Sequence, residues 1–201
     1  RLRLQAGEAG LKLDAFETVL DNHIHSRGIE KTISQIIFPF LERIGILWVT
    51  NHINPAQEHL VSNLIRQKLI VGIDSADSRL SSDKTLLLYL PEGEHHELGL
   101  LFACYLLKSR GANILYLGAN VPLKDLAYVV NLKKPNYLYT HLTTVAHNFN
   151  FDKYLSKFRI LLPNAELVVS GQVAQEYKKK APALVQIKKT LPEMMEFVAA
   201  L

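Results

Sequence analysis

From Thr85 to the end of the chain, short apolar runs alternate with longer amphipathic stretches. The apolar runs are predicted strands, and the stretches between them carry the helical period. Strands that recur every ~20 to 30 residues with a helix between them form right-handed β-α-β units and a parallel sheet. The predicted strands are Thr85–Leu90, Ile114–Leu117, Tyr137–Thr140, Leu167–Ser170 and Leu184–Ile187, and the predicted helices are Glu97–Arg110, Leu123–Leu132, Asn150–Leu162, Gln172–Lys179 and Leu191–Leu201. This α/β part, residues 83–201, is therefore predicted to be a five-stranded parallel flavodoxin-like (Rossmann-like) domain.

The part before it, residues 1–82, is predicted to be a helical bundle, because its apolar residues recur at helical spacing. Gly28 is expected to end the first helix, and Asn54-Pro55 to begin the third as N-cap and first helical residue. The second and third helices then meet at a tight connection. The apolar stripes are Leu13, Phe16 and Leu20; Ile33, Ile36, Ile37, Phe40, Leu41 and Ile44; and Ala56, Leu60 and Leu64 with Val61 and Ile65.

Composition excludes several classes of protein. No apolar run reaches the ~18 to 20 residues that a membrane span needs, and the single Cys104 allows neither an intramolecular disulfide nor a cysteine metal cluster. We therefore expect a protein of the cytoplasm. The net charge of +4 comes from residues 83–201, where the lysine runs at 178–180 and 188–189 lack interleaved aromatics and are typical of a solvated face. The chain itself is a poor candidate for DNA recognition. Because it begins with Arg1, we expect a longer protein with sequence before this point.

The loop after the first predicted strand, Pro91–Gly99, is the strongest candidate site. It lacks the glycine spacing of a dinucleotide site and the Gly-Lys-Ser/Thr of a P-loop. It places His96 at the carboxyl edge of the sheet, where ligands bind in such folds. A carboxylate two residues earlier, Glu94, can fix the tautomer of a metal-bound imidazole, and Gly99 lets a bulky ligand approach the backbone. Glu94-x-His96-x-x-Gly99 is therefore predicted to be a metal ligand with its supporting groups.

This segment resembles the Asp/Glu-x-His-x-x-Gly signature of cobalamin-binding domains. The resemblance implies that His96 replaces the cofactor's own base below cobalt. Thr140-His141-Leu142 is similar to the Ser-x-Leu element of that family, which implies that Thr140 and Leu142 lie at the nucleotide tail. Gly171-Gln172 stands where the family usually has two glycines, so Gln172 is expected to crowd the tail.

The helical part continues the resemblance. Trp48, followed after nine intervening residues by Glu58-His59, resembles the motif of light-responsive MerR-type regulators of the CarH and LitR kind. That resemblance implies that Trp48, Glu58 and His59 cover the adenosyl group on the upper face of adenosylcobalamin. In those regulators a histidine follows the Trp and binds cobalt after illumination. This chain has Val49 there, so a bis-histidine state is not expected.

The resemblance implies a non-enzymatic function: the adenosylcobalamin-binding sensory part of a MerR-type transcriptional regulator. Light would break the cobalt-carbon bond and release a homo-oligomer from DNA, which a preceding domain outside this chain would bind. Two alternatives remain. The chain could be the corrinoid protein of a cobalamin-dependent methyltransferase, or an interaction module that has lost its cofactor, as Val49 and Gln172 would permit.

Overall fold

The computed structural model describes residues 13–41, 55–76, 82–143 and 149–201. The chain divides into two compact units, Arg1–Asp74 and Ser75–Leu201. The second unit begins several residues before position 83, where the change in sequence pattern places the boundary. Within the described ranges, no helix is long and apolar enough to cross a membrane.

The first unit consists of helices, as the periodicity predicts. Helix α1 spans Leu13–Thr32, but Gly28 interrupts it with φ 79° and ψ 162°, so this glycine does end the first regular helix. A wide π-helical turn, η1, follows at Ile33–Ile37, with the Phe38 amide bonded to the Ile33 carbonyl five residues back. Pro39 explains that turn, because proline has no N–H and its ring clashes with the carbonyl four residues earlier.

Helix α3 spans Pro55–Asp74; the predicted N-cap, Asn54, lies outside the described residues. The buried stripe of α3 is Val61, Ile65 and Leu69, at spacing i, i+4, i+8. The predicted stripe was wrong in part, because Leu60 is 49% exposed. One residue along a helix rotates the side chain by about 100°, so Leu60 leaves the face that Val61 shares.

Packing within the first unit joins α3 to α1. The Lys68 ammonium of α3 lies 2.7 Å from the Glu17 carboxylate and 2.9 Å from that of Asp21, both on α1. Beside these pairs, the rings of Phe16 and Phe40 stack with centroids 5.6 Å apart. Both a polar and an aromatic contact therefore support the apolar core of the bundle.

The second unit is a five-stranded, fully parallel sheet in the order β2-β1-β3-β4-β5, so the predicted flavodoxin-like class is confirmed. The strands are β1 Thr85–Pro91, β2 Asn113–Val121, β3 Tyr137–His141, β4 Leu167–Ser170 and β5 Val185–Ile187, and the helices are α4 Leu98–Ser109, α5 Leu123–Lys133, α6 Phe151–Leu161, α7 Gln172–Glu176 and α8 Leu191–Ala199.

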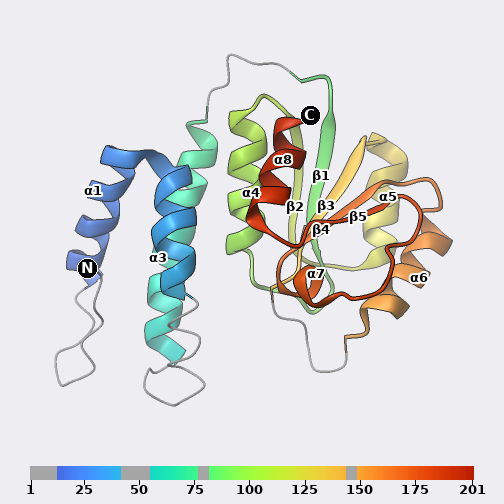
Figure 1. The fold of residues 1–201 in the computed structure, drawn as a ribbon, viewed down its shortest axis with the longest axis horizontal. Coiled ribbons are helices and arrows are strands. Elements are labelled where there is room, and N and C mark those ends of the chain that lie inside the picture. Colours follow the sequence, from blue (N-terminus) through green and yellow to red (C-terminus); the bar gives the residue numbers. More distant parts are fainter. Residues whose placement is uncertain (1–12, 42–54, 77–81, 144–148) are drawn as a thin grey trace. The chain divides into compact units, whose positions relative to one another are not determined.

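Helices cover both faces of this sheet (Figure 1): α4 and α8 lie on one side, and α5 and α6 on the other. Strand β1 is buried along almost its whole length, as a central parallel strand requires. On the α5/α6 side, Leu87 and Tyr89 of β1 join one continuous core with Leu126, Leu155 and Phe158.

Two predicted boundaries differ from the structure by three residues or more. Strand β2 continues beyond Leu117 to Val121 because Gly118, at φ 81°, absorbs an irregularity while pairing with β1 resumes. Helix α7 stops at Glu176 rather than Lys179, because Tyr177 is extended. The Tyr177 hydroxyl donates to Asp152 of α6, a tertiary contact that the local sequence does not reveal.

Candidate functional site

The carboxyl ends of β1, β3 and β4 lie side by side in the sheet, and each is followed by one of the predicted motifs. The residues at these ends are Glu94 and His96 after β1, Thr140, His141 and Leu142 at β3, and Gly171 after β4. This edge is where parallel sheets bind ligands. The fold therefore gathers three motifs that are about 30 to 45 residues apart in sequence into one place.

Glu94 and His96 form a tight pair. The Nδ1 atom of His96 lies 2.7 Å from Oε1 of Glu94, and the same oxygen accepts the backbone N–H groups of His95 and His96, both at 2.8 Å. Glu94 is 2% exposed, whereas the side chain of His96 is 60% exposed. Because the carboxylate holds Nδ1, a metal bond from this exposed ring would be made by Nε2.

Asn120, at the end of β2, holds the loop that carries this pair. Its side-chain oxygen accepts a hydrogen bond from the Gly93 backbone N–H at 2.9 Å, and its own backbone N–H donates to the Glu94 carbonyl at 3.1 Å. Its φ of 58° lies in the left-handed region, which asparagine tolerates better than most residues. Sequence reasoning missed Asn120; the asparagine that follows Gly118-Ala119 at the end of an apolar strand was the available signal.

Thr140, at the end of β3, is fully buried. Its hydroxyl has no hydrogen-bond partner among the residues that the structure describes. A buried hydroxyl without a partner is costly, so this group is suited to a ligand that brings a hydrogen-bonding atom.

Leu142 and Gly171 form a backbone contact between the ends of β3 and β4. The Leu142 amide donates to the Ser170 carbonyl at 2.9 Å, and the Val173 amide donates to the Leu142 carbonyl at 3.2 Å. A Cβ on Gly171 would lie 2.5 Å from the Leu142 carbonyl oxygen, and the φ of this glycine is +92°. Only glycine fits here, so the glycine of the predicted motif is explained by backbone packing.

His141 lies between two of the motifs. Its Nδ1 atom is 2.8 Å from the Ser170 hydroxyl, which is in turn 2.6 Å from the Tyr139 hydroxyl. The other edge of the ring packs on Gly99, where an added Cβ would be 2.2 Å from its Cδ2 atom. Burial lowers the pKa of His141 to about 4, although the Glu94 carboxylate raises it. The imidazole is therefore neutral near pH 7 and within electrostatic reach of Glu94.

Gln172 is the first residue of α7. Its side chain is exposed and its amide nitrogen donates to the Glu176 carboxylate at 2.9 Å, one helical turn further along α7. In this arrangement the glutamine side chain follows its own helix. The expected crowding of a nucleotide tail by Gln172 therefore gains no support from its conformation.

The residues predicted for the upper face belong to the first unit. Glu58 and His59 lie in the first turn of α3, with Oε2 of Glu58 3.3 Å from Nδ1 of His59, and their side chains are 35% and 73% exposed. An acidic residue at this end of a helix is also favoured by the helix dipole alone. Trp48 and Val49 lie outside the described residues.

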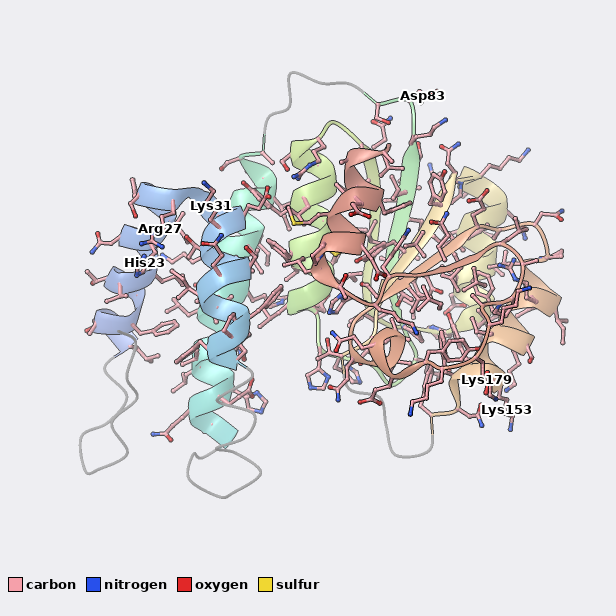
Figure 2. The ribbon with its side chains drawn as sticks, viewed as in Figure 1. His23, Arg27, Lys31, Asp83, Lys153 and Lys179 are labelled. Carbon is pink, nitrogen blue, oxygen red and sulfur yellow. The ribbon has the colours of Figure 1, made fainter. Side chains whose placement is uncertain are left out.

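Other polar clusters offer no rival site. Across the described ranges, no group of three or more His, Cys, Asp or Glu side chains is arranged to hold a metal ion. In the lysine run at 178–180, Lys179 pairs with Asp152 at 2.5 Å, beside Lys153 (Figure 2). This run therefore forms part of a solvated, charge-paired surface, as its composition indicates.

The chain is similar to known proteins over most of its length. Residues 4–71 match the family model described as a B12 binding domain. The chain is 31% identical over 163 residues to the HTH-type transcriptional repressor CarH of Myxococcus xanthus, covering 80% of this chain and 53% of that protein. It is 29% identical over 183 residues to the repressor CarA of the same organism, covering 88% of this chain and 57% of that protein.

A solved structure shows the same fold. The monomethylamine corrinoid protein of Methanosarcina barkeri superposes with a TM-score of 0.63 at 12% identity, covering 94% of this chain and 92% of that one. At this identity the likeness concerns the fold alone. The chain spans little more than half the length of the two repressors, so the activity of a whole protein does not follow from them.

The residues at the sheet edge fit a corrinoid. An exposed imidazole whose Nδ1 atom is held by a buried carboxylate is suited to act as a cobalt ligand. Among the described residues, the buried Thr140 hydroxyl has no hydrogen-bond partner. Residues 4–71 thus match a B12 binding domain, and the chain shares its fold with a corrinoid protein. Over most of its length the sequence is similar to the repressors CarH and CarA.

Proposed function

We propose that this chain is the adenosylcobalamin-binding sensory domain of a MerR-type transcriptional regulator, and that it is not an enzyme. The proposal places it in the cytoplasm, as part of a homo-oligomer that binds DNA through a separate preceding domain. Its similarity to two transcriptional repressors supports the regulatory role. The observation that carries cofactor binding is the Glu94–His96 pair at the carboxyl edge of the sheet.

In this proposal each described residue has a defined task. His96 would bind cobalt through Nε2, while Glu94 holds Nδ1 and so keeps the ring oriented and basic. Thr140 supplies a hydrogen bond to the nucleotide tail, and Gly99, Leu142, Gly171 and Gln172 line its path. Trp48, Glu58 and His59 are proposed to face the adenosyl group.

The bound cofactor would supply a cobalt-carbon bond that light can break. The chain's part would be to bind the intact form of the cofactor more tightly than the form without the adenosyl group, so that loss of that group would shift the conformational equilibrium of the protein. Because this chain has Val49 after Trp48, it has no histidine at that position that could bind cobalt once the adenosyl group is lost.

The first experiment is an absorbance titration of the chain with adenosylcobalamin in the dark. We expect saturable binding with the spectrum of a histidine-ligated corrinoid whose own base has been displaced. His96→Ala should abolish that spectrum. His95→Ala is the matched control, because it changes an exposed histidine in the same loop and should leave the spectrum unchanged. If the parent protein takes up no corrinoid, the proposal fails.

The light response is tested separately. The loaded protein is illuminated with green or blue light, and size-exclusion chromatography is run before and after. A smaller assembly after illumination is expected. If the assembly is unchanged, the proposed light response is wrong and the chain is a cobalamin sensor only. If the purified protein contains methylcobalamin, the methyl-transfer alternative is favoured instead.

A further inference from the structure

We propose that β2 is a contact surface between two copies of this chain, whose β2 strands pair edge to edge and antiparallel about a two-fold axis. The pairing would join two five-stranded sheets into one. This inference rests on the homo-oligomer of the proposed function and deepens it by naming an interface. It concerns a lateral edge of the sheet and not the carboxyl ends of the strands, so the corrinoid takes no part in it.

The two lateral edges of the sheet, β2 and β5, differ in their protection against other chains. Proteins protect an edge with a short strand, charged side chains or proline. Strand β5 has three residues, Val185–Ile187, and the lysine pair at 188–189 follows it directly. Strand β2 has nine residues, Asn113–Val121, none of them charged or proline, and its Tyr116 and Leu117 are 37% and 36% exposed. The β5 edge is therefore protected, whereas the β2 edge is suited to pair with another strand.

The first half of β2 has a regular edge. Over Asn113–Tyr116 its pairing with β1 keeps one register. The Asn113 N–H donates to the carbonyl of the residue before β1, so alternate residues such as Ile114 direct their backbone N–H and C=O groups away from β1. An antiparallel pair of identical strands is self-complementary across a two-fold axis. With that axis at Leu115, Asn113 of one copy lies opposite Leu117 of the other.

The charges beside β2 favour a second copy in the antiparallel direction. Helix α4 packs on β2 and runs opposite to it, as the helix of a β-α-β unit does (Figure 1). The N-terminal end of α4 carries Glu97, which accepts a hydrogen bond from the Tyr116 hydroxyl at 3.2 Å. Its C-terminal end carries Lys108 and Arg110. The two-fold axis reverses the second copy, so the acidic end of each α4 comes to the side of the basic end of the other, which favours this arrangement over a parallel one.

The test is sedimentation equilibrium of the full chain in the dark, with and without adenosylcobalamin, where we expect a dimer or a multiple of it. Two double variants share Leu117→Lys and differ only in carrying Asn113→Lys or Asn113→Glu. The first places lysine opposite lysine twice in each dimer, and the second places unlike charges there. The dimer of the lysine–lysine variant should dissociate at least about tenfold more readily than that of the glutamate–lysine variant.

Two single variants complete the design. Ile114→Pro removes an N–H that faces away from β1, which an edge strand tolerates, and it should abolish the dimer. Ile160→Lys is the control, because Ile160 is an apolar residue of α6 that is 79% exposed, and it should leave the dissociation constant unchanged.

Each result decides the inference. A monomeric full chain, or equal dissociation of the two double variants, shows that β2 does not pair with its copy. If circular dichroism shows that Ile114→Pro is unfolded, the two double variants decide. Slow hydrogen exchange of the Ile114 amide in a monomer would mean that the same chain covers this edge, which also overturns the inference. Corrinoid uptake is measured separately by the absorbance titration, so loss of the interface and failure of cobalamin binding are different outcomes.

Discussion

The packing of His141 on Gly99 predicts a strong coupling between the two positions. Gly99→Ala places a methyl group where the ring now lies, 2.2 Å from its Cδ2 atom. The ring must leave, which forfeits the hydrogen bond to Ser170 and forces neighbouring atoms apart. Overpacking of this kind and one lost hydrogen bond together cost about 2 to 3 kcal/mol of unfolding free energy.

The same substitution should have the opposite sign once the ring is removed. In the His141→Ala background the new methyl group meets no ring. Gly99 lies in the first turn of α4, where alanine is favoured over glycine by about 0.5 to 1 kcal/mol. The double variant should therefore be more stable than His141→Ala alone, and the coupling energy should be about 3 kcal/mol, near the upper end for residues in contact.

Urea denaturation followed by far-UV circular dichroism measures the four unfolding free energies of this cycle. Amide hydrogen exchange of α4 assigns the change to the second unit. A cost for Gly99→Ala that is the same in both backgrounds, within about 0.5 kcal/mol, would refute the contact and with it the claim that His141 closes this space.

Three further predictions follow from the same edge of the sheet. Gly171→Ala should destabilise the fold by about 3 kcal/mol or more in thermal or urea unfolding, because a positive φ is combined with a collision against the Leu142 carbonyl. Gly93→Ala is the control: its φ is +85° but the space around it is open, so it should cost only about 1 kcal/mol of unfolding free energy. Equal costs for the two substitutions would contradict the collision. Glu94→Gln should weaken adenosylcobalamin binding about 10- to 100-fold in an absorbance titration, because a neutral amide supports the imidazole less well; undiminished affinity would exclude that role. Since burial lowers the pKa of His141 to about 4 in the folded protein, the unfolded chain takes up a proton first as the pH falls below about 6.5. The parent should then lose stability relative to His141→Ala between pH 6.5 and about 4, by up to about 1.4 kcal/mol per pH unit; parallel pH profiles would contradict the burial.

Much of the second unit was predictable from local sequence. Its central strand, Thr85–Pro91, is a continuous apolar run, and such runs between amphipathic helices leave few topologies once crossovers are right-handed. The ligand edge follows from that topology, so the sequence alone predicts that Glu94, His96 and Thr140 lie there.

The missed features all depend on partners distant in sequence. Leu60 fits a helical stripe as well as Val61 does. Which of the two faces the core depends on how the helix packs in the bundle, and Leu60 is the one left exposed. Helix α7 ends early because Tyr177 bonds Asp152 of α6. Asn120 looks like an ordinary residue at a strand end until its contacts with Gly93 and Glu94 are seen.

The sequence by itself thus determined the class of fold and the residue types at the ligand edge, because periodicity and short motifs are local properties. Only the tertiary structure decided what fills the space over Gly99. That space is closed by His141, which is 42 residues away in sequence and is brought there by the pairing of β1 with β3. No spacing rule reports such a contact, because it depends on the three-dimensional path of two separate strands.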